Sequence, residues 1–205
     1  MMTPALPRLR AMVYRATSPM LMRHVGRGTL IFQNLHLARP HINVTVGDEC
    51  IIGPNVHFEV MNAGSISIGD GTLIHTGCHI AANRLVTIGS NVAIAEYVSI
   101  RDQEPRFTPA DGIRGQGYHV ASIVIEDNVL IGRGVYIGPG TRIRSGTIIA
   151  ANSVVRGTFP PNVLLAGQPA TVRRLIGPDG ARHSLAANVS IMPLAHGRHT
   201  PPVRP

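Results

Sequence analysis

The 205-residue chain contains no tryptophan and no lysine, and only 4% of its residues are aromatic. Without lysine, the formal charge of +8 comes from an excess of arginine over acidic residues, and the guanidinium group suits contacts with phosphates. No nucleic-acid-binding motif accompanies this charge, so we expect an anionic cofactor, lipid headgroup or sugar phosphate as a partner rather than nucleic acid. The two cysteines, Cys50 and Cys78, are expected to be free thiols in the core rather than a disulfide.

The beginning of the chain also lacks a long apolar run. Residues 1–43 are expected to form a basic segment with a helix in which Leu6, Leu9 and Met12 lie on one side and arginines on the other, broken at Ser18-Pro19. No apolar run or cleavage site follows the charges, so the segment does not resemble a signal peptide, and we expect a cytoplasmic protein. Two roles remain open for it: packing against the end of the main domain, and weak contact with a membrane surface.

A six-residue repeat is the most regular feature of the chain. Each unit begins with an aliphatic residue, most often followed by Gly, and its fifth residue is small or branched except in the last unit. The units begin at Val46, Ile52, Ile68, Ile74, Ile88, Ile94, Ile125, Ile131, Ile137, Ile143, Ile149 and Val155. The fifth and sixth residues of one unit and the first residue of the next unit point inward, outward and inward in turn, as in a short strand. The small second residue permits a corner. Short strands that stack on the turn below form a solenoid.

These residues resemble the hexapeptide-repeat acyltransferase family, and residues 159–163 (FPPNV) and 166–170 (AGQPA) are similar to the ending of the maltose, galactoside and exopolysaccharide O-acetyltransferases. The resemblance implies an all-β solenoid, a left-handed parallel β-helix over residues 44–175 with a short N-terminal helix, a protruding loop at residues 101–122 and a C-terminal tail at residues 176–205. We expect disorder in the tail after about Met192. The resemblance further implies a homotrimer that transfers an acetyl group from acetyl-CoA to a hydroxyl of a sugar, a polysaccharide precursor or a small natural product.

Three hexads per coil, as in that family, explain where the spacing departs from six residues. The departures, at residues 58–67, 80–87 and 100–124, all follow the third hexad of a coil. The extra chain is therefore expected to leave from one edge of the β-helix.

The sixth residues of the hexads form columns that face outward. One column is apolar and contains Ile51, Leu73, Ala93, Leu130 and Ile148. We expect it to be a subunit interface, with cover by the N-terminal helix as the alternative. The next column contains His57, His79, Ser99, Tyr136 and Val154. It borders the edge with the extra chain, where we expect the chemistry.

Transfer to a hydroxyl needs a general base, and in the resembling O-acetyltransferases a His on the loop after the third hexad has this role. The matching positions here hold Gln103 and Pro105, neither of which accepts a proton near neutral pH. One hypothesis is a relocated base, either His119 at the far end of the loop or His79, with Asp102 orienting the base or shaping a turn. The others are an N-acyltransferase whose amine acceptor needs little help from a base, and a noncatalytic binding or scaffold protein.

The resemblance places the pantetheine arm of acetyl-CoA in a groove between neighbouring β-helices. The matching residues are Gly132, Arg133 and Ala151 for the pantetheine, with Arg156 and Arg173 as candidates for the phosphates.

A zinc enzyme on the same type of β-helix is the remaining alternative. It would need three converging histidines, and the spacing of His57, His75 and His79 does not resemble the ligand pattern of the β-helical carbonic anhydrases. We therefore expect no metal.

Overall fold

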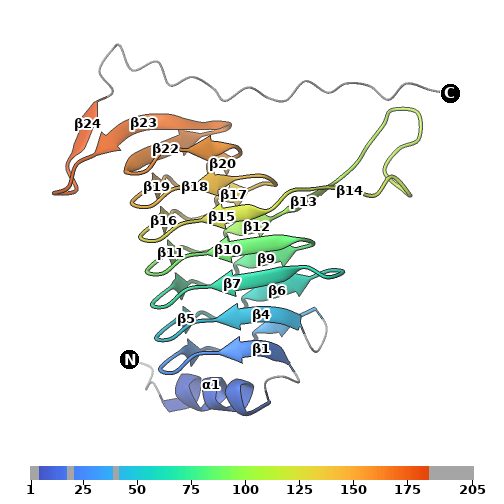
Figure 1. Ribbon diagram of the computed structural model, residues 1–205, viewed down its shortest axis with the longest axis vertical. Helices are drawn as coiled ribbons and strands as arrows, with labels where there is room; N and C mark the ends of the chain where they lie inside the picture. The colour runs from blue at the N-terminus through green and yellow to red at the C-terminus, as the bar shows by residue number, and fades with distance from the viewer. Residues whose placement is uncertain (1–4, 18–20, 39–41, 185–205) are drawn as a thin grey trace.

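The computed structural model describes residues 5–17, 21–38 and 42–184. Three parallel sheets form the walls of a solenoid that rises from an N-terminal helix to a C-terminal antiparallel extension (Figure 1). Each of the first six coils contributes one strand to each wall, the last turn adds β21 and β22 to the first two walls, and each strand pairs with the equivalent strand of the neighbouring coils. The left-handed parallel β-helix that the family resemblance implies is confirmed.

The strands of the three walls follow one another in sequence order along the solenoid. The first sheet contains β1 (Met22–Val25), β4 (Ile42–Val46), β7 (Ser65–Ile68), β10 (Leu85–Ile88), β15 (Ile123–Ile125), β18 (Arg142–Ile143) and β21 (Thr158–Phe159). The second contains β2 (Leu30–Ile31), β5 (Ile51–Ile52), β8 (Leu73–Ile74), β11 (Ala93–Ile94), β16 (Leu130–Ile131), β19 (Ile148–Ile149) and β22 (Val163–Gly167), extended by β23 (Ala170–Ile176) and β24 (Arg182–Ser184). The third contains β3 (His36–Leu37), β6 (His57–Val60), β9 (His79–Ala82), β12 (Ser99–Arg101), β17 (Tyr136–Ile137) and β20 (Val154–Val155).

The first residues of the hexads stack in register through the core, as expected. Ile68, for example, pairs with Val46 on one side and with Ile88 on the other. The apolar column is also a continuous ladder on the second sheet, and the pairing extends it to Leu30 at one end and to Leu164 at the other. The hexad pattern therefore specifies which side chains meet between coils.

The β-helix begins with β1, earlier than the boundary expected at residue 44. The first coil has inward residues Val25, Ile31 and Leu37, which pair with the first residues of the next coil. Their spacing is also six residues, but Phe32 stands where most units have a small residue, and this hides the repeat.

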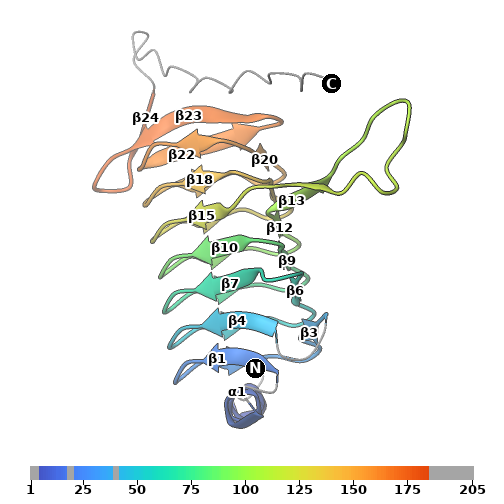
Figure 2. The same cartoon turned by 45° about the vertical axis from the view of Figure 1, so that its right-hand side comes forward.

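One helix, α1 (Ala5–Thr17), packs against β1 and β2 and lies across the end of the solenoid (Figure 2). Pro7 and Ala11 are buried against this end. In the described part of the chain, no helix has the length and apolarity needed to cross a membrane.

The core between the walls is aliphatic and includes the two cysteines. Cys50 and Cys78 are free thiols and are buried, as expected. Burial raises the pKa of the Cys78 thiol to about 11, so this side chain stays protonated near neutral pH.

The longest insertion forms an antiparallel hairpin of β13 (Gln103–Pro105) and β14 (Tyr118–Val120), which leaves the solenoid directly after β12 of the third sheet (Figure 2). Its tip projects away from the walls, and Phe107 and Ile113 there have exposed fractions of 67% and 56%. The expected protruding loop therefore exists and has its own β-structure at the base. The expected disorder after Met192 lies outside the described residues.

Candidate active site

Asp102 is a buried carboxylate that fixes the base of the hairpin. Its Oδ1 accepts a hydrogen bond from the backbone N–H of Asn83 at 2.7 Å, and its Oδ2 accepts from Arg84 and Leu85 at 2.8 Å each. Its side chain is fully buried, and its own carbonyl accepts the N–H of Ala121 at the end of the hairpin. Both carboxylate oxygens are occupied by backbone donors, which supports the turn-shaping role and does not bring Asp102 to a substrate.

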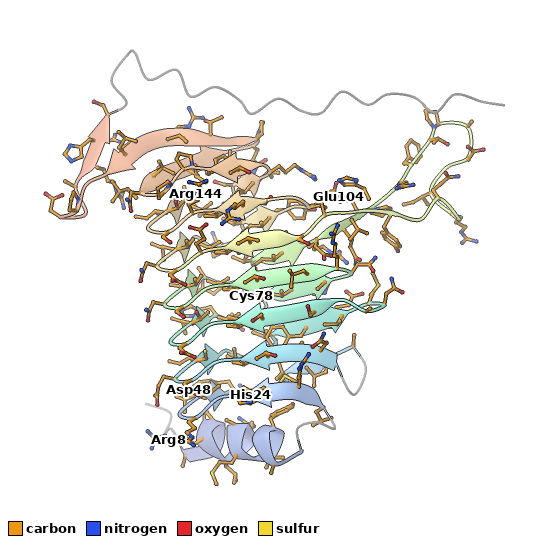
Figure 3. The ribbon with its side chains drawn as sticks, in the orientation of Figure 1. Arg8, His24, Asp48, Cys78, Glu104 and Arg144 are labelled. Carbon is orange, nitrogen blue, oxygen red and sulfur yellow. The ribbon has the colours of Figure 1, made fainter. Side chains whose placement is uncertain are left out.

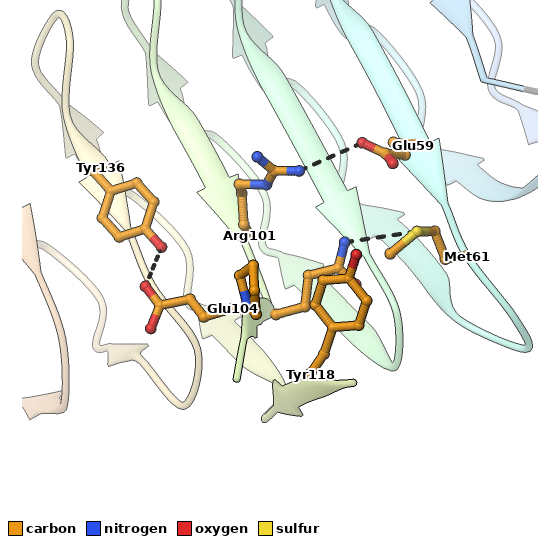
Figure 4. Close-up of a pocket in the computed structure, with 8 residues that line it drawn as sticks. Glu59, Met61, Arg101, Glu104, Tyr118 and Tyr136 are labelled. Atoms are coloured by element: carbon orange, nitrogen blue, oxygen red, sulfur yellow. Dashed lines mark hydrogen bonds and ion pairs between the residues drawn. The ribbon is translucent and has the colours of Figure 1, made fainter. Parts of the chain in front are cut away.

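A pocket with a volume of about 350 Å³ opens beside this anchor, between the hairpin and the third sheet (Figure 4). Its walls contain Glu59, Met61, Arg101, Gln103, Glu104, Pro105, Tyr118 and Tyr136. The two positions that lack the expected His, 103 and 105, thus line the pocket. Negatively and positively charged groups and two phenol rings surround this space, which suits a hydroxylated ligand.

Glu104 connects the hairpin to the third sheet on one side of the pocket. Tyr136 donates its hydroxyl to Glu104 Oε1 at 2.8 Å, and Arg156 donates Nη1 to Glu104 Oε2 at 2.9 Å while its Nη2 contacts Oε1 (Figure 4 shows the tyrosine bond). The Arg156 hydrogen bonds hold the pKa of Glu104 below its usual value, so this carboxyl stays ionised near neutral pH. Burial and the Glu104 carboxylate raise the pKa of Tyr136 to about 12, so the phenol keeps its proton.

On the other side of the pocket, Glu59 holds a histidine and an arginine. Its Oε2 lies 3.1 Å from His79 Nε2 and 3.7 Å from Arg101 Nη2. The His79 ring stacks on that of His57 with centroids 4.7 Å apart. Burial, with smaller effects of His57 and Arg101, lowers the pKa of His79, so the imidazole is neutral near neutral pH and able to accept a proton.

His119 lies on β14 directly opposite Glu104 on β13 and has an exposed side chain. Side chains of opposed residues in an antiparallel pair project from the same face, with Cα atoms roughly 4.5–5.5 Å apart. The positive form of His119 also contributes, as a smaller effect than Arg156, to the lowered pKa of Glu104. An ionised carboxylate in this position can orient an imidazole and stabilise the imidazolium that proton transfer creates.

The expected cofactor residues fall into two groups. Gly132, Arg133 and Ala151 lie together at stacked corners between the second and third sheets, where a Cβ on Gly132 would come within 2.6 Å of the Ala151 nitrogen. Arg173 is exposed on β23, and its Nε donates to the Ala166 carbonyl at 3.4 Å. Arg156, in contrast, is held by Glu104 at the pocket, so the structure gives it a partner other than a phosphate.

Glu104, Glu59 and Tyr118 are pocket residues that the sequence analysis did not identify. Glu59 is two residues after His57, a position that strand alternation places on the same outward face. Glu104 and Tyr118 had no comparable signal, because their positions depend on how the base of the hairpin lies against the third sheet. Within the described residues, no group of three His, Cys, Asp or Glu side chains could hold a metal ion.

Comparison with known proteins gives matches to both the repeat and the whole β-helix. The family model described as "Bacterial transferase hexapeptide (six repeats)" matches residues 122–157. A protein of Escherichia coli strain K12 whose name describes it as a lipopolysaccharide biosynthesis O-acetyl transferase, WbbJ, is 30% identical over an alignment of 138 residues that covers 63% of this chain and 70% of that protein.

Several solved structures share the fold at lower identity. AntD, an N-acyltransferase from Bacillus cereus, in complex with dTDP and 3-hydroxybutyryl-CoA, has a TM-score of 0.63 and 15% identity, covering 73% of this chain and 80% of that chain. The hexapeptide-repeat acetyltransferase VCA0836 from Vibrio cholerae has a TM-score of 0.58 and 23% identity, covering 84% and 92%. A galactoside acetyltransferase in complex with coenzyme A has a TM-score of 0.56 and 21% identity, covering 89% and 90%. At these identities the structures establish the likeness of the fold.

Proposed function

Since the chain belongs to the hexapeptide-repeat acyltransferase family, we propose that it transfers an acetyl group from acetyl-CoA to a hydroxyl of a saccharide or a saccharide precursor. The observation that carries the proposal is the pocket between the hairpin and the third sheet, whose walls combine carboxylates, an arginine and two tyrosines. The WbbJ relative, by its name an O-acetyl transferase of lipopolysaccharide biosynthesis, supports a saccharide acceptor. Coenzyme A in the solved relatives supports the donor.

The corner residues fit a coenzyme A arm. Gly132 and Ala151 carry no bulky side chain, which suits close approach of the pantetheine arm. Arg133 and Arg173 are exposed and charged, so guanidinium groups that can contact phosphates lie near the same end of the solenoid. Acetyl-CoA would supply the thioester, and the protein would supply the backbone amides and guanidinium groups that hold it. Arg156 takes no part in this arrangement while it is bound to Glu104.

His119 is the proposed general base, positioned by Glu104. It would accept the hydroxyl proton as the acceptor oxygen attacks the thioester carbonyl carbon, and would return that proton to the departing sulfur as the carbon–sulfur bond breaks. His79 is the second candidate. Its Nε2 already contacts Glu59 at 3.1 Å, so this nitrogen is less available to an acceptor hydroxyl; neither His79 nor His119 is itself a lining residue of the pocket.

The apolar column on the second sheet supports assembly as a trimer with sites between subunits. The exposed fractions of Ile51 and Leu130 are 36% and 46%. Because α1 lies across the end of the solenoid, it does not form a cover along this wall (Figure 1). A neighbouring subunit is therefore the proposed cover.

The test is release of coenzyme A thiol from acetyl-CoA with a panel of sugars, nucleotide-sugars and amino-sugars. We expect His119→Ala to lower kcat by about 10²- to 10⁴-fold with coenzyme A binding intact. His75→Ala is the control, because His75 is exposed at a corner beside Glu96, 3.9 Å away, and outside the pocket. Loss of activity in His79→Ala instead would assign the base to His79, and coenzyme A binding without release on any acceptor would overturn the proposed function.

N-Acyl transfer is the second candidate function. It is favoured by Gln103 and Pro105, which leave β13, the hairpin strand that holds the family's His positions, without a histidine. An amine acceptor that reaches the site unprotonated needs little help from a base. Turnover confined to amino-sugars and insensitive to both His119→Ala and His79→Ala would support it.

A further inference from the structure

The helix α1 carries two different faces, and only one of them is needed to close the β-helix. Pro7 and Ala11 are buried against the first coil, and Tyr14 packs on the edge of the core. These positions follow the spacing of one helical face. Packing against the end of the main domain, one of the two roles left open for this segment, is thus performed by this face alone.

Four other apolar side chains of α1 face solvent. The exposed fractions of Leu6, Leu9 and Met12 are 56% each, and that of Val13 is 51%. Four of the eleven large apolar residues that are exposed in the described chain therefore lie on this one helix. Closing the end of the core does not account for them, because exposure of this kind on one face of a helix has no benefit for packing.

The charge around these apolar residues is positive. The helix sequence ALPRLRAMVYRAT contains arginine and no acidic residue. Arg8 is exposed at the same end of the molecule (Figure 3), and the neighbouring β1 and its corner add the exposed residues His24 and Arg27. The nearest acidic side chains in the second coil include Asp48, whose Oδ1 already accepts the backbone N–H of Arg27 at 2.7 Å, and Glu49.

We propose that the outward face of α1, formed by Leu6, Leu9, Met12, Val13 and Arg8, is a docking surface for an anionic phospholipid membrane. Apolar and arginine side chains that alternate around a short helix are typical of helices that lie in the plane of a bilayer surface. Anionic headgroups complement the arginines, and the acyl boundary accepts the apolar side chains. An acidic protein partner would match the charge but not the row of flexible aliphatic side chains.

The position of α1 leaves this surface accessible. The helix lies across one tip of the elongated molecule, and several coils separate it from the place where the protruding hairpin leaves the solenoid (Figures 1 and 2). A flat surface can therefore approach the tip without meeting the hairpin. If the subunits associate side by side as proposed above, three copies of the surface would face one membrane, and their binding would reinforce one another.

The experiment measures co-sedimentation with phosphatidylcholine vesicles that contain or lack phosphatidylglycerol. The test variant is Leu9→Gln/Met12→Gln, which removes apolar groups without adding charge. Ile113→Gln is the matched control, because Ile113 is also 56% exposed but lies on the hairpin. We expect wild type to bind the phosphatidylglycerol vesicles, the double variant to bind at least about tenfold more weakly, and the control to stay within about twofold of wild type.

A second variant, Arg8→Gln, separates the charge from the apolar contacts. It should weaken binding to phosphatidylglycerol vesicles and have little effect on the weak binding to pure phosphatidylcholine. The proposal is overturned if wild type does not bind the anionic vesicles, if Ile113→Gln weakens binding as much as the double variant, or if the double variant changes only the oligomeric state in solution. Thiol release with a water-soluble acceptor should be equal in wild type and the double variant, so a failure here is distinguishable from a failure of the proposed function.

Discussion

At the scale of single residues, Asp102 shows how one buried carboxylate organises the candidate site. It connects the turn at residues 83–85 with the base of the hairpin, and no solvent reaches it. Three backbone donors compensate for the loss of hydration that burial of a charge entails. The pocket therefore depends on a residue that does not line it.

We expect Asp102→Asn to lower the free energy of unfolding by about 1.5–3 kcal/mol, because an amide NH₂ would face a backbone donor and leave it without an acceptor. Urea denaturation followed by circular dichroism measures this change. Asp111→Asn is the control, since Asp111 is exposed at the hairpin tip, where it accepts the Thr108 hydroxyl at 2.9 Å, and should shift stability by less than about 0.5 kcal/mol. Unchanged stability together with lost turnover would instead support the orienting role for Asp102.

The candidate site could be predicted from the sequence only in part, and the reason is physical. His79 was placed in the correct column because strand alternation and coil stacking are periodic, and periodic features can be counted. Glu104 was missed because its partner Arg156 is 52 residues away and meets it only through the orientation of the hairpin. The expected role of Arg156 in phosphate binding has the same origin, because nothing in the sequence around Arg156 indicates that the Glu104 carboxylate lies within hydrogen-bond distance.

At the scale of elements, the hairpin strands pair only with each other, and the hairpin is docked on the solenoid by charge as well as by the buried Asp102 at its base. Glu104 holds Tyr136 and Arg156 on two further coils of the third sheet. Because Arg156 lowers the pKa of Glu104, this contribution to stability is complete above the pKa of an unfolded Glu, about 4.3, and is lost as the pH falls through the lower folded-state value. Glu104 is partly exposed to solvent, so the effect should be modest.

We expect Glu104→Gln to lower the melting temperature by about 1–3 °C at neutral pH and to have no effect once the pH is well below about 4. Differential scanning calorimetry at several pH values measures both quantities. A constant difference between wild type and variant across the whole pH range would contradict the assigned ionisation of Glu104. Glu49→Gln, at an exposed corner far from the hairpin, supplies a comparison with the same change of charge.

The elements themselves were largely predictable because one repeat specifies them. An aliphatic residue every six positions gives a buried ladder, and a small residue after it gives a corner, so strands, walls and the edge with insertions all follow. The first coil was hidden where Phe32 replaces the small corner residue. The antiparallel extension formed by β23 and β24 has no hexads, and its pairing depends on tertiary contacts with β22.

At the scale of the whole molecule, the apolar surfaces of α1 and of the second sheet lie outside the core, and they differ in what surrounds them. The outward face of α1 is bordered by arginine, whereas the ladder on the second sheet runs along the wall from Leu30 to Leu164 without an interrupting charge. The equivalent column of the first sheet contains polar residues such as Thr45 and Arg142. A charge-free ladder along a straight wall is suited to a copy of the same wall region rather than to a membrane.

We therefore expect the double substitution Ile51→Glu/Leu130→Glu to convert the proposed trimer into monomers, because it places two charges within a proposed contact that would have to exclude water. Light scattering after size-exclusion chromatography measures the mass, and circular dichroism confirms that the β-helix is retained, since both side chains face outward. Val124→Glu, which adds one charge of the same sign on the first sheet, should leave the proposed trimer intact. A wild-type protein that is monomeric, or a double variant that stays trimeric, would show that the ladder is not the interface. If the monomeric variant binds coenzyme A weakly while keeping its fold, the groove for the donor requires the neighbouring subunit, and the small residues Gly132 and Ala151 form only one of its walls.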